Sequence, residues 1–203
     1  MINYFNFNSL KTDVDYMINN MGKDIIVNGS TNPIKAIFNR KGKVSRENDD
    51  FYLYTLSGLN CGDLIEYNNK HYLVLNDESN NAYNIHSNYI RLCNYHYIKE
   101  TVIPGEKVQV GTDNFGRPIY EETEGETIIT HIYGIVDKFT PNSTLDTQYG
   151  VNPLDNKLTF TIPSLNNEEL FAINDVLEVY GYTYKIVAED KLKAGLITFT
   201  MES

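Results

Sequence analysis

One strand–turn–strand pattern occurs twice in this chain, at residues 62–75 and at residues 174–187. In the first copy, two short apolar-rich runs flank Asn68-Asn69, a pair that tolerates the positive φ angles of a tight two-residue turn. Aligned without a gap, that pair meets Tyr180-Gly181 of the second copy. Acidic and aromatic positions also correspond: Asp63/Asp175, Glu66/Glu178 and Tyr72/Tyr184. The pattern predicts two related β-hairpins, and with them two related small β units.

Further short runs rich in β-branched and aromatic residues surround the two hairpins, and turn-forming residues bound them. Strands at such short intervals are typical of small antiparallel barrels or sandwiches. The predicted strands are 24–28, 33–38, 51–56, 82–85, 88–99, 107–110, 119–122, 127–139, 158–162 and 196–201. We therefore expect a mainly β protein with two small antiparallel barrel or sandwich units, at residues 1–100 and 101–203, with the boundary near Pro104-Gly105. The polar segments 39–50 and 141–156 are predicted to be long loops.

An amphipathic helix of about three turns is predicted at the N-terminus, with Asn8 or Ser9 as its N-cap and Gly22 as its stop. The apolar positions at helical spacing are Leu10, Val14, Met17, Ile18 and Met21. The apolar stripe either packs on the following sheet or docks on a neighbouring subunit. We favour the first interpretation, because covering a sheet is the ordinary role of such a helix.

The balance of charge disfavours nucleic-acid binding as the main function. The chain has a formal net charge of −10, and an acidic protein does not neutralise phosphates. It suits instead the wall of a passage through which DNA slides without adhering. The one basic cluster, at residues 40–46, is interrupted by Gly42 and followed by acidic residues, so it indicates a solvated loop tip.

Cys61 and Cys93 are the only cysteines, which leaves a disulfide between them open but gives no disulfide framework. No basic stretch followed by a long apolar core opens the chain, and no apolar run approaches the ~20 residues of a membrane span. We therefore expect no signal peptide, no membrane association, and synthesis in a reducing cytoplasm.

Chemistry-bearing motifs are missing from the sequence. His71, His86, His96 and His131 belong to no metal-binding spacing, and no nucleophile elbow, phosphate loop or dinucleotide fingerprint occurs. Thr183 replaces His71 in the second hairpin, which favours a structural role for His71, and His131 is expected to be half-buried in a strand. We therefore predict no enzymatic activity, no catalytic residues, no cofactor and no metal site.

Acidic side chains raise two alternatives to this interpretation, a catalytic pair of carboxylates and a pair of metal sites. Adjacent acidic residues such as Glu121-Glu122 point to opposite faces of a strand, so they do not converge on one bond. The recurrence of Asp63 and Glu66 in the second hairpin suggests paired metal sites, but strand entry and an exposed sheet position explain both residues more simply.

Tyrosine is abundant, with 16 Tyr and 9 Phe but no Trp. Tyr covers strands, and it is also enriched at protein–protein interfaces, where it adds contact area and a hydrogen bond at low entropic cost. A subunit of a larger assembly is therefore the functional expectation.

The N-terminal half resembles small structural proteins of tailed bacteriophages that infect low-GC Gram-positive hosts, particularly head-completion and head–tail connector (neck) proteins. The residues that carry the resemblance are the N-terminal helix, Ile25-Ile26-Val27-Asn28-Gly29, residues 33–38, residues 62–74 and residues 89–94. The resemblance is best over residues 1–100. Connector proteins are usually nearer one domain in length, and the second unit departs from that pattern.

The resemblance implies a non-enzymatic virion protein, made in the host cytoplasm, whose copies form a ring. Its partners would be portal or adaptor proteins on one side and tail proteins on the other, with DNA crossing the lumen without specific binding. One alternative is a tail component, such as a tail terminator or a baseplate-associated protein. Another is a carbohydrate- or receptor-binding module, which exposed Tyr with Asn and Asp would suit. A hydrolase is the third alternative.

Overall fold

The computed structural model describes residues 7–40, 50–77, 79–80, 85–105, 107–112, 114–123, 125–138, 157–165, 167 and 170–203. Most of the predicted strand at 82–85, most of the predicted loop at 39–50 and the whole predicted loop at 141–156 lie outside these residues. Contacts divide the chain into two compact units. One joins residues 1–95 to residues 133–203, and the other is His96–Ile132.

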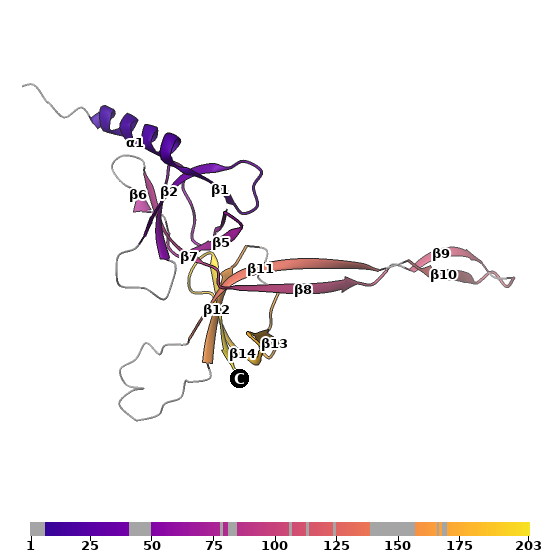
Figure 1. Ribbon diagram of the computed structural model, residues 1–203. Helices are drawn as coiled ribbons and strands as arrows, with labels where there is room; N and C mark the ends of the chain where they lie inside the picture. The colour runs from indigo at the N-terminus through magenta and orange to yellow at the C-terminus, as the bar shows by residue number, and fades with distance from the viewer. Residues whose placement is uncertain are drawn as a thin grey trace, which may run out of the picture. The chain divides into compact units, whose positions relative to one another are not determined.

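The first half of the larger unit is a helix and a closed six-stranded antiparallel barrel (Figure 1). The barrel order is β3-β2-β1-β4-β5-β7, and β7 pairs with β3 to close the circle. Its elements are α1 (Phe7–Met21), β1 (Lys23–Val27), β2 (Ile34–Arg40), β3 (Asp50–Thr55), β4 (Leu64–Tyr67), β5 (Lys70–Val74) and β7 (His86–Leu92), with the short β6 (Ser79–Asn80) beside β7. Ile25, Leu53, Ile65 and Ile90 fill the interior and are fully buried.

The second half forms a six-stranded antiparallel sheet in the order β13-β14-β15-β12-β11-β8. Its elements are β8 (Tyr95–Ile103), β11 (Glu126–Lys138), β12 (Lys157–Pro163), β13 (Val176–Val179), β14 (Tyr182–Asp190) and β15 (Leu196–Glu202). Its core is aromatic, because the ring of Phe160 contacts the rings of Tyr95 and Phe171, and Phe171 also contacts Phe199. The expectation of a mainly β protein with two small barrel-like units and one helix is confirmed.

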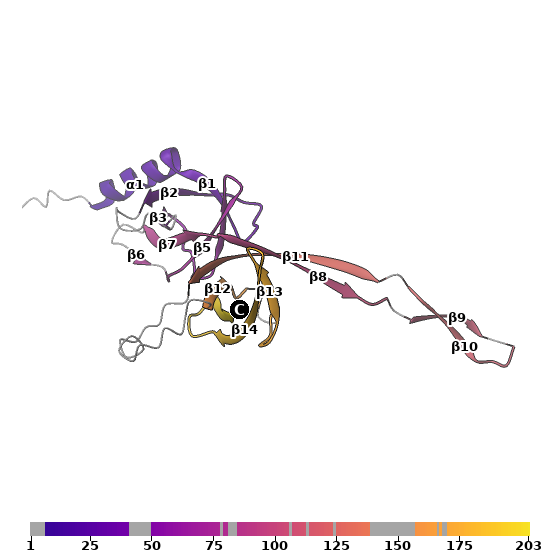
Figure 2. The same ribbon diagram turned by 60° about the horizontal axis from the view of Figure 1, so that its bottom comes forward.

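The two sheets repeat one topology. If β1, β2, β3, β7, β5 and β4 are matched to β8, β11, β12, β15, β14 and β13, five of the six neighbour pairings of the barrel recur in the second sheet. The sixth, β1 with β4, corresponds to β8 with β13, where side chains replace a strand ladder. There the Tyr95 hydroxyl donates to the carbonyl of Glu178, and the Tyr180 hydroxyl donates to the carbonyl of Asn94 at 2.8 Å. The second sheet is therefore a nearly closed copy of the first barrel (Figure 2).

The two predicted hairpins are confirmed, and they match bond for bond. Residues 68 and 69 have φ angles of 50° and 59°, and residues 180 and 181 have 51° and 82°, so both turns use positive φ at both positions. Before each hairpin an aspartate accepts from the backbone N–H three residues earlier: Asp63 from Asn60 and Asp175 from Ala172, both at 2.8 Å. The same two aspartates pair through their backbone with Val74 and Ile186.

The smaller unit is a two-stranded ribbon. It contains most of β8, the N-terminal part of β11, and between them the hairpin of β9 (Lys107–Thr112) and β10 (Pro118–Glu122). The predicted strands at 107–110 and 119–122 are confirmed here. In the duplicated topology this ribbon takes the place of the short β1–β2 turn at Asn28-Gly29.

Two boundary predictions are wrong. The segment 88–99 was expected to be one strand, but Cys93 and Asn94 interrupt it, so β7 ends the first barrel and β8 begins the second sheet. The Asn94 side chain causes the break, because it accepts from the N–H of Val136 and donates to its carbonyl, both at 2.7 Å. The helix begins at Phe7, so Asn8 and Ser9 lie inside its first turn. Pro104-Gly105, near which the domain boundary is predicted, directly follows the end of β8. The division of the chain into domains 1–100 and 101–203 stays a prediction.

Candidate functional site

The junction between the two barrels holds a charged cluster and a stacked pair of aromatic rings. Arg91 on β7 lies at its centre. Its Nε donates to Asp50 Oδ1 at 2.8 Å, and its Nη1 donates to Asp137 Oδ2 at 2.7 Å. Asp50 is the cross-strand neighbour of Arg91 and is only 4% exposed, whereas Asp137 belongs to β11 of the second sheet. One guanidinium therefore links the two barrels.

The hydroxyl of Tyr89 completes this cluster by donating to Asp50 Oδ2. Burial, followed by the hydrogen bond to Asp50, raises the pKa of Tyr89 above its usual value, so the phenol stays protonated. Burial alone would lower the pKa of Arg91, but Asp50, Tyr89 and Asp137 outweigh it and raise that pKa. The cluster is thus an ion pair with a neutral phenol, and neither Arg91 nor Tyr89 exchanges a proton near neutral pH.

A second contact at the junction is apolar and very close. Leu73 and Cys61 of the first barrel pack against Ile135 and Leu196 of the second sheet, and all four side chains are buried. Beside them, a Cβ atom on Gly62 would lie 1.8 Å from the carbonyl oxygen of Gly195. Only glycine permits this approach of the two backbones.

His71 adds a stacked aromatic contact to the junction. Its ring lies 3.5 Å from that of Tyr133, with an angle of 9° between the planes. The structural role predicted for His71 stays a prediction, and the stacking on Tyr133 fits it. Its counterpart Thr183 in the second hairpin is exposed.

Both cysteines are free and belong to the junction's apolar cluster. Burial raises the pKa of the Cys61 thiol, and it raises the pKa of Cys93 to about 12. Neither thiol is therefore a thiolate nucleophile at neutral pH.

His96 and His131 form a pair in the ribbon that the sequence analysis missed. His96 Nε2 lies 3.0 Å from His131 Nδ1, and the rings stack. Both side chains are exposed, so the expectation of a half-buried His131 is wrong. Partial burial and then the charge of His131 lower the pKa of His96. The two residues are 35 apart in sequence, and only the pairing of β8 with β11 would have revealed the contact.

The two repeated aspartates, Asp63 and Asp175, accept hydrogen bonds within the fold. Asp63 Oδ1 accepts from Asn28 Nδ2 at 2.8 Å in addition to the turn bond of Oδ2, so both oxygens are used locally. Within the described residues, no group of three His, Cys, Asp or Glu is arranged to hold a metal ion. The described helix is also too short to cross a bilayer.

Exposed apolar side chains form the remaining candidate surface. Ten of the 21 large hydrophobic residues that are exposed in the described part of the chain lie in the ribbon, although the ribbon has only residues 96–132. They are Ile98, Val102, Ile103, Val108, Val110, Phe115, Ile119, Tyr120, Ile128 and Ile129. On helix α1, Tyr16, Met17 and Met21 are also exposed. Surfaces of this kind are typical of protein–protein interfaces.

Comparison with known families agrees with the division seen in the topology. The YomX N-terminal domain matches residues 3–87, and the YomX C-terminal domain matches residues 94–202, which is more than half of the chain. The chain belongs to the YomX family. This family is of Bacillus phage type (SPBc2 prophage-like), so the resemblance to phage proteins is confirmed at that level. No curated protein and no solved structure matches the chain.

Proposed function

We propose that this protein is a non-enzymatic structural component of a phage virion, whose copies form a ring that joins the portal side of the head to the tail. The observation that carries the proposal is the concentration of exposed apolar side chains on a ribbon and a helix, because soluble monomers rarely leave such surfaces open. Family membership supports a phage setting.

The chemistry of the junction is consistent with a structural role. Arg91, His71 and both cysteines, which are the residue types that enzymes most often use, are occupied in holding two barrels together. Two barrels joined by these contacts are a suitable building block for a ring, because subunit positions in a ring must be reproducible. The net charge of −10 suits a lumen that DNA crosses without adhering.

The proposal is tested in two steps. Mass photometry of the purified full chain is expected to show a closed oligomer, and proteomics of purified particles should find the protein in virions. Deletion of its gene should then give separate heads and tails. Tails of irregular length would favour the tail-terminator alternative, and a strictly monomeric protein that is absent from particles would contradict the proposal.

A carbohydrate- or receptor-binding module is the second candidate, since Tyr180 and Tyr182 expose 63% and 69% of their surface beside the turn of the second hairpin. Aromatic rings presented in this way stack on sugar faces. A glycan-array signal that is lost in Tyr182→Ala would favour this candidate over the connector.

A further inference from the structure

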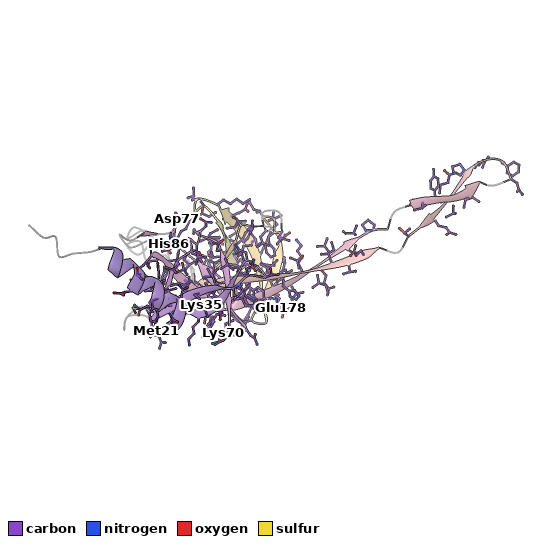
Figure 3. All side chains as sticks on the ribbon, turned by 90° about the horizontal axis from the view of Figure 1, so that it is seen from above. Met21, Lys35, Lys70, Asp77, His86 and Glu178 are labelled. Atoms are coloured by element: carbon purple, nitrogen blue, oxygen red, sulfur yellow. The ribbon has the colours of Figure 1, made fainter. Side chains whose placement is uncertain are left out.

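The ribbon of residues 96–132 has apolar side chains on both of its faces. The contact between His96 and His131 puts these two residues on one face, and side chains two residues apart in a strand share a face. Ile98, Val102 and Ile129 therefore lie on the histidine face, with exposures of 50%, 69% and 55%. Ile103 and Ile128 lie on the opposite face and are exposed as well. Figure 3 shows side chains standing on both sides of these strands.

The ribbon is nevertheless a defined element. Between its two strand pairs the backbones approach so closely that a Cβ atom on Gly105 would lie 1.6 Å from the carbonyl oxygen of Thr123. A Cβ atom on Gly125 would lie 2.5 Å from the carbonyl oxygen of Ile103. A two-stranded hairpin alone is at best marginally stable in water, and it needs a further layer against its apolar face. The covering layer must therefore come from another surface.

The distribution of charge restricts which surface of a second copy can supply that layer. By sequence, residues 96–132 carry three basic and seven acidic side chains, a net charge of −4. Residues 133–203 carry five basic and ten acidic side chains, a net charge of −5. Residues 1–95 carry nine basic and ten acidic side chains, a net charge of −1. Another ribbon or the second sheet would repel the ribbon, and the N-terminal half would do so least.

Within the N-terminal half, helix α1 offers an apolar surface that the chain covers only in part. Ile18 is 2% exposed, and the helix packs along β2. Met17 and Met21 flank the same stripe but are 48% and 68% exposed. Met21 is labelled in Figure 3 at the end of the helix. Methionine adapts its shape to a partner and is common at binding surfaces.

We propose that the ribbon of one copy packs on helix α1 of a neighbouring copy, with Ile98, Val102 and Ile129 against Met17 and Met21. Each copy then gives a ribbon and receives one, a heterologous contact that closes into a ring when the rotation allows. This inference rests on the proposed ring and names the surfaces that hold it together.

Mass photometry of full-length variants tests the contact. Ile129→Asp and Met21→Glu are each expected to raise the concentration for half-assembly by about tenfold or more, since each places a charge in the apolar contact. The matched controls are Thr127→Asp on the same ribbon face and Asn19→Glu on the same helix, both at exposed positions. Circular dichroism establishes that all four variants remain folded.

Cross-linking identifies the partner surface. Val102→Cys protein is mixed with Met21→Cys protein and treated with a short bismaleimide. The wild type gives the background reaction of the native thiols of Cys61 and Cys93. A mixed dimer in excess over both homodimers supports the inference. If residues 102 and 21 cross-link only inside single chains of the Val102→Cys/Met21→Cys double variant, the inference is overturned. Assembly unchanged by Ile129→Asp and Met21→Glu overturns it while the ring stands, and a wild type that is monomeric at every concentration overturns both.

Discussion

Arg91 and Asp137 form an ion pair between the two barrels, with 2.7 Å from Nη1 to Oδ2. The same guanidinium satisfies Asp50, which is almost fully buried, so the two carboxylates differ in what they lose without Arg91. This difference gives the first prediction.

Arg91→Ala is expected to destabilise the protein by about 3–5 kcal/mol, because it leaves the charge of Asp50 buried without an opposite charge, with only the Tyr89 hydroxyl as a hydrogen-bond donor. Asp137→Asn is the matched control and should cost about 0–1 kcal/mol, since Asp137 is 40% exposed and its attraction is screened by water. Urea unfolding followed by circular dichroism measures both. Equal costs would contradict the difference in burial between Asp50 and Asp137.

Gly62→Ala is expected to cost about 2–5 kcal/mol, since a Cβ there meets the carbonyl of Gly195 and the residue has a φ of +90°. Gly29→Ala separates the two causes, because Gly29 has a φ of +68° and nothing within 4 Å of its Cβ position. It should cost only about 1–2 kcal/mol. Thermal unfolding compares the two variants, and a Gly62→Ala protein no less stable than Gly29→Ala would refute the close approach of the barrels.

The two equivalent aspartates should differ in a defined order. Asp175→Ala removes one hydrogen bond, from the N–H of Ala172, and is expected to cost about 1 kcal/mol. Asp63→Ala removes the matching bond and also the one from Asn28 Nδ2, so about 2 kcal/mol is expected. Chemical denaturation measures both costs. Equal costs, or a larger cost for Asp175→Ala, would contradict the additional hydrogen bond from Asn28 to Asp63.

The histidine pair predicts a local pH dependence in the ribbon. Burial and His131 lower the pKa of His96 from 6.5, so the unfolded chain binds a proton more readily than the folded one. The contribution of His96 is therefore intact above pH 6.5 and is lost as the pH falls from there through the lowered folded value. NMR of the imidazole Cε1–H measures the titration. His131→Gln should move the pKa of His96 upward, and no movement would mean that the rings do not interact.

The thiols of Cys61 and Cys93 should resist modification in the folded protein, because burial raises the pKa of each. A pKa of about 12 for Cys93 leaves about a thousandfold less thiolate at pH 8 than the usual value of 9.0 would give. Reaction with a disulfide reagent should therefore be slow in buffer and rapid in urea. Fast reaction of both thiols in buffer would contradict their place in the junction.

Much of the fold could be predicted because it is local. Asn68-Asn69 and Tyr180-Gly181 fix two turns through their φ angles, and Asp63 and Asp175 close the preceding turns, so both hairpins follow from short stretches of sequence. The break at Cys93-Asn94 could not be predicted in this way. It depends on hydrogen bonds to Val136, more than forty residues later in the chain.

The candidate surfaces were predicted less completely. The sequence indicated an amphipathic helix with two possible partners, and the structure shows that Ile18 is covered while Met17 and Met21 are not. The sequence also placed Ile98 and Ile129 in strands, but a strand pattern does not say whether a neighbouring layer exists. Exposure is a property of the folded chain.

The sequence by itself determined which segments form strands and where the tight turns lie, because backbone preferences and alternation act over a few residues. Only the tertiary structure decided that β8 leaves the first barrel, that Arg91 reaches Asp137, and that His96 meets His131. These contacts join residues 35 to 46 positions apart, and their geometry follows from how whole strands pair and pack.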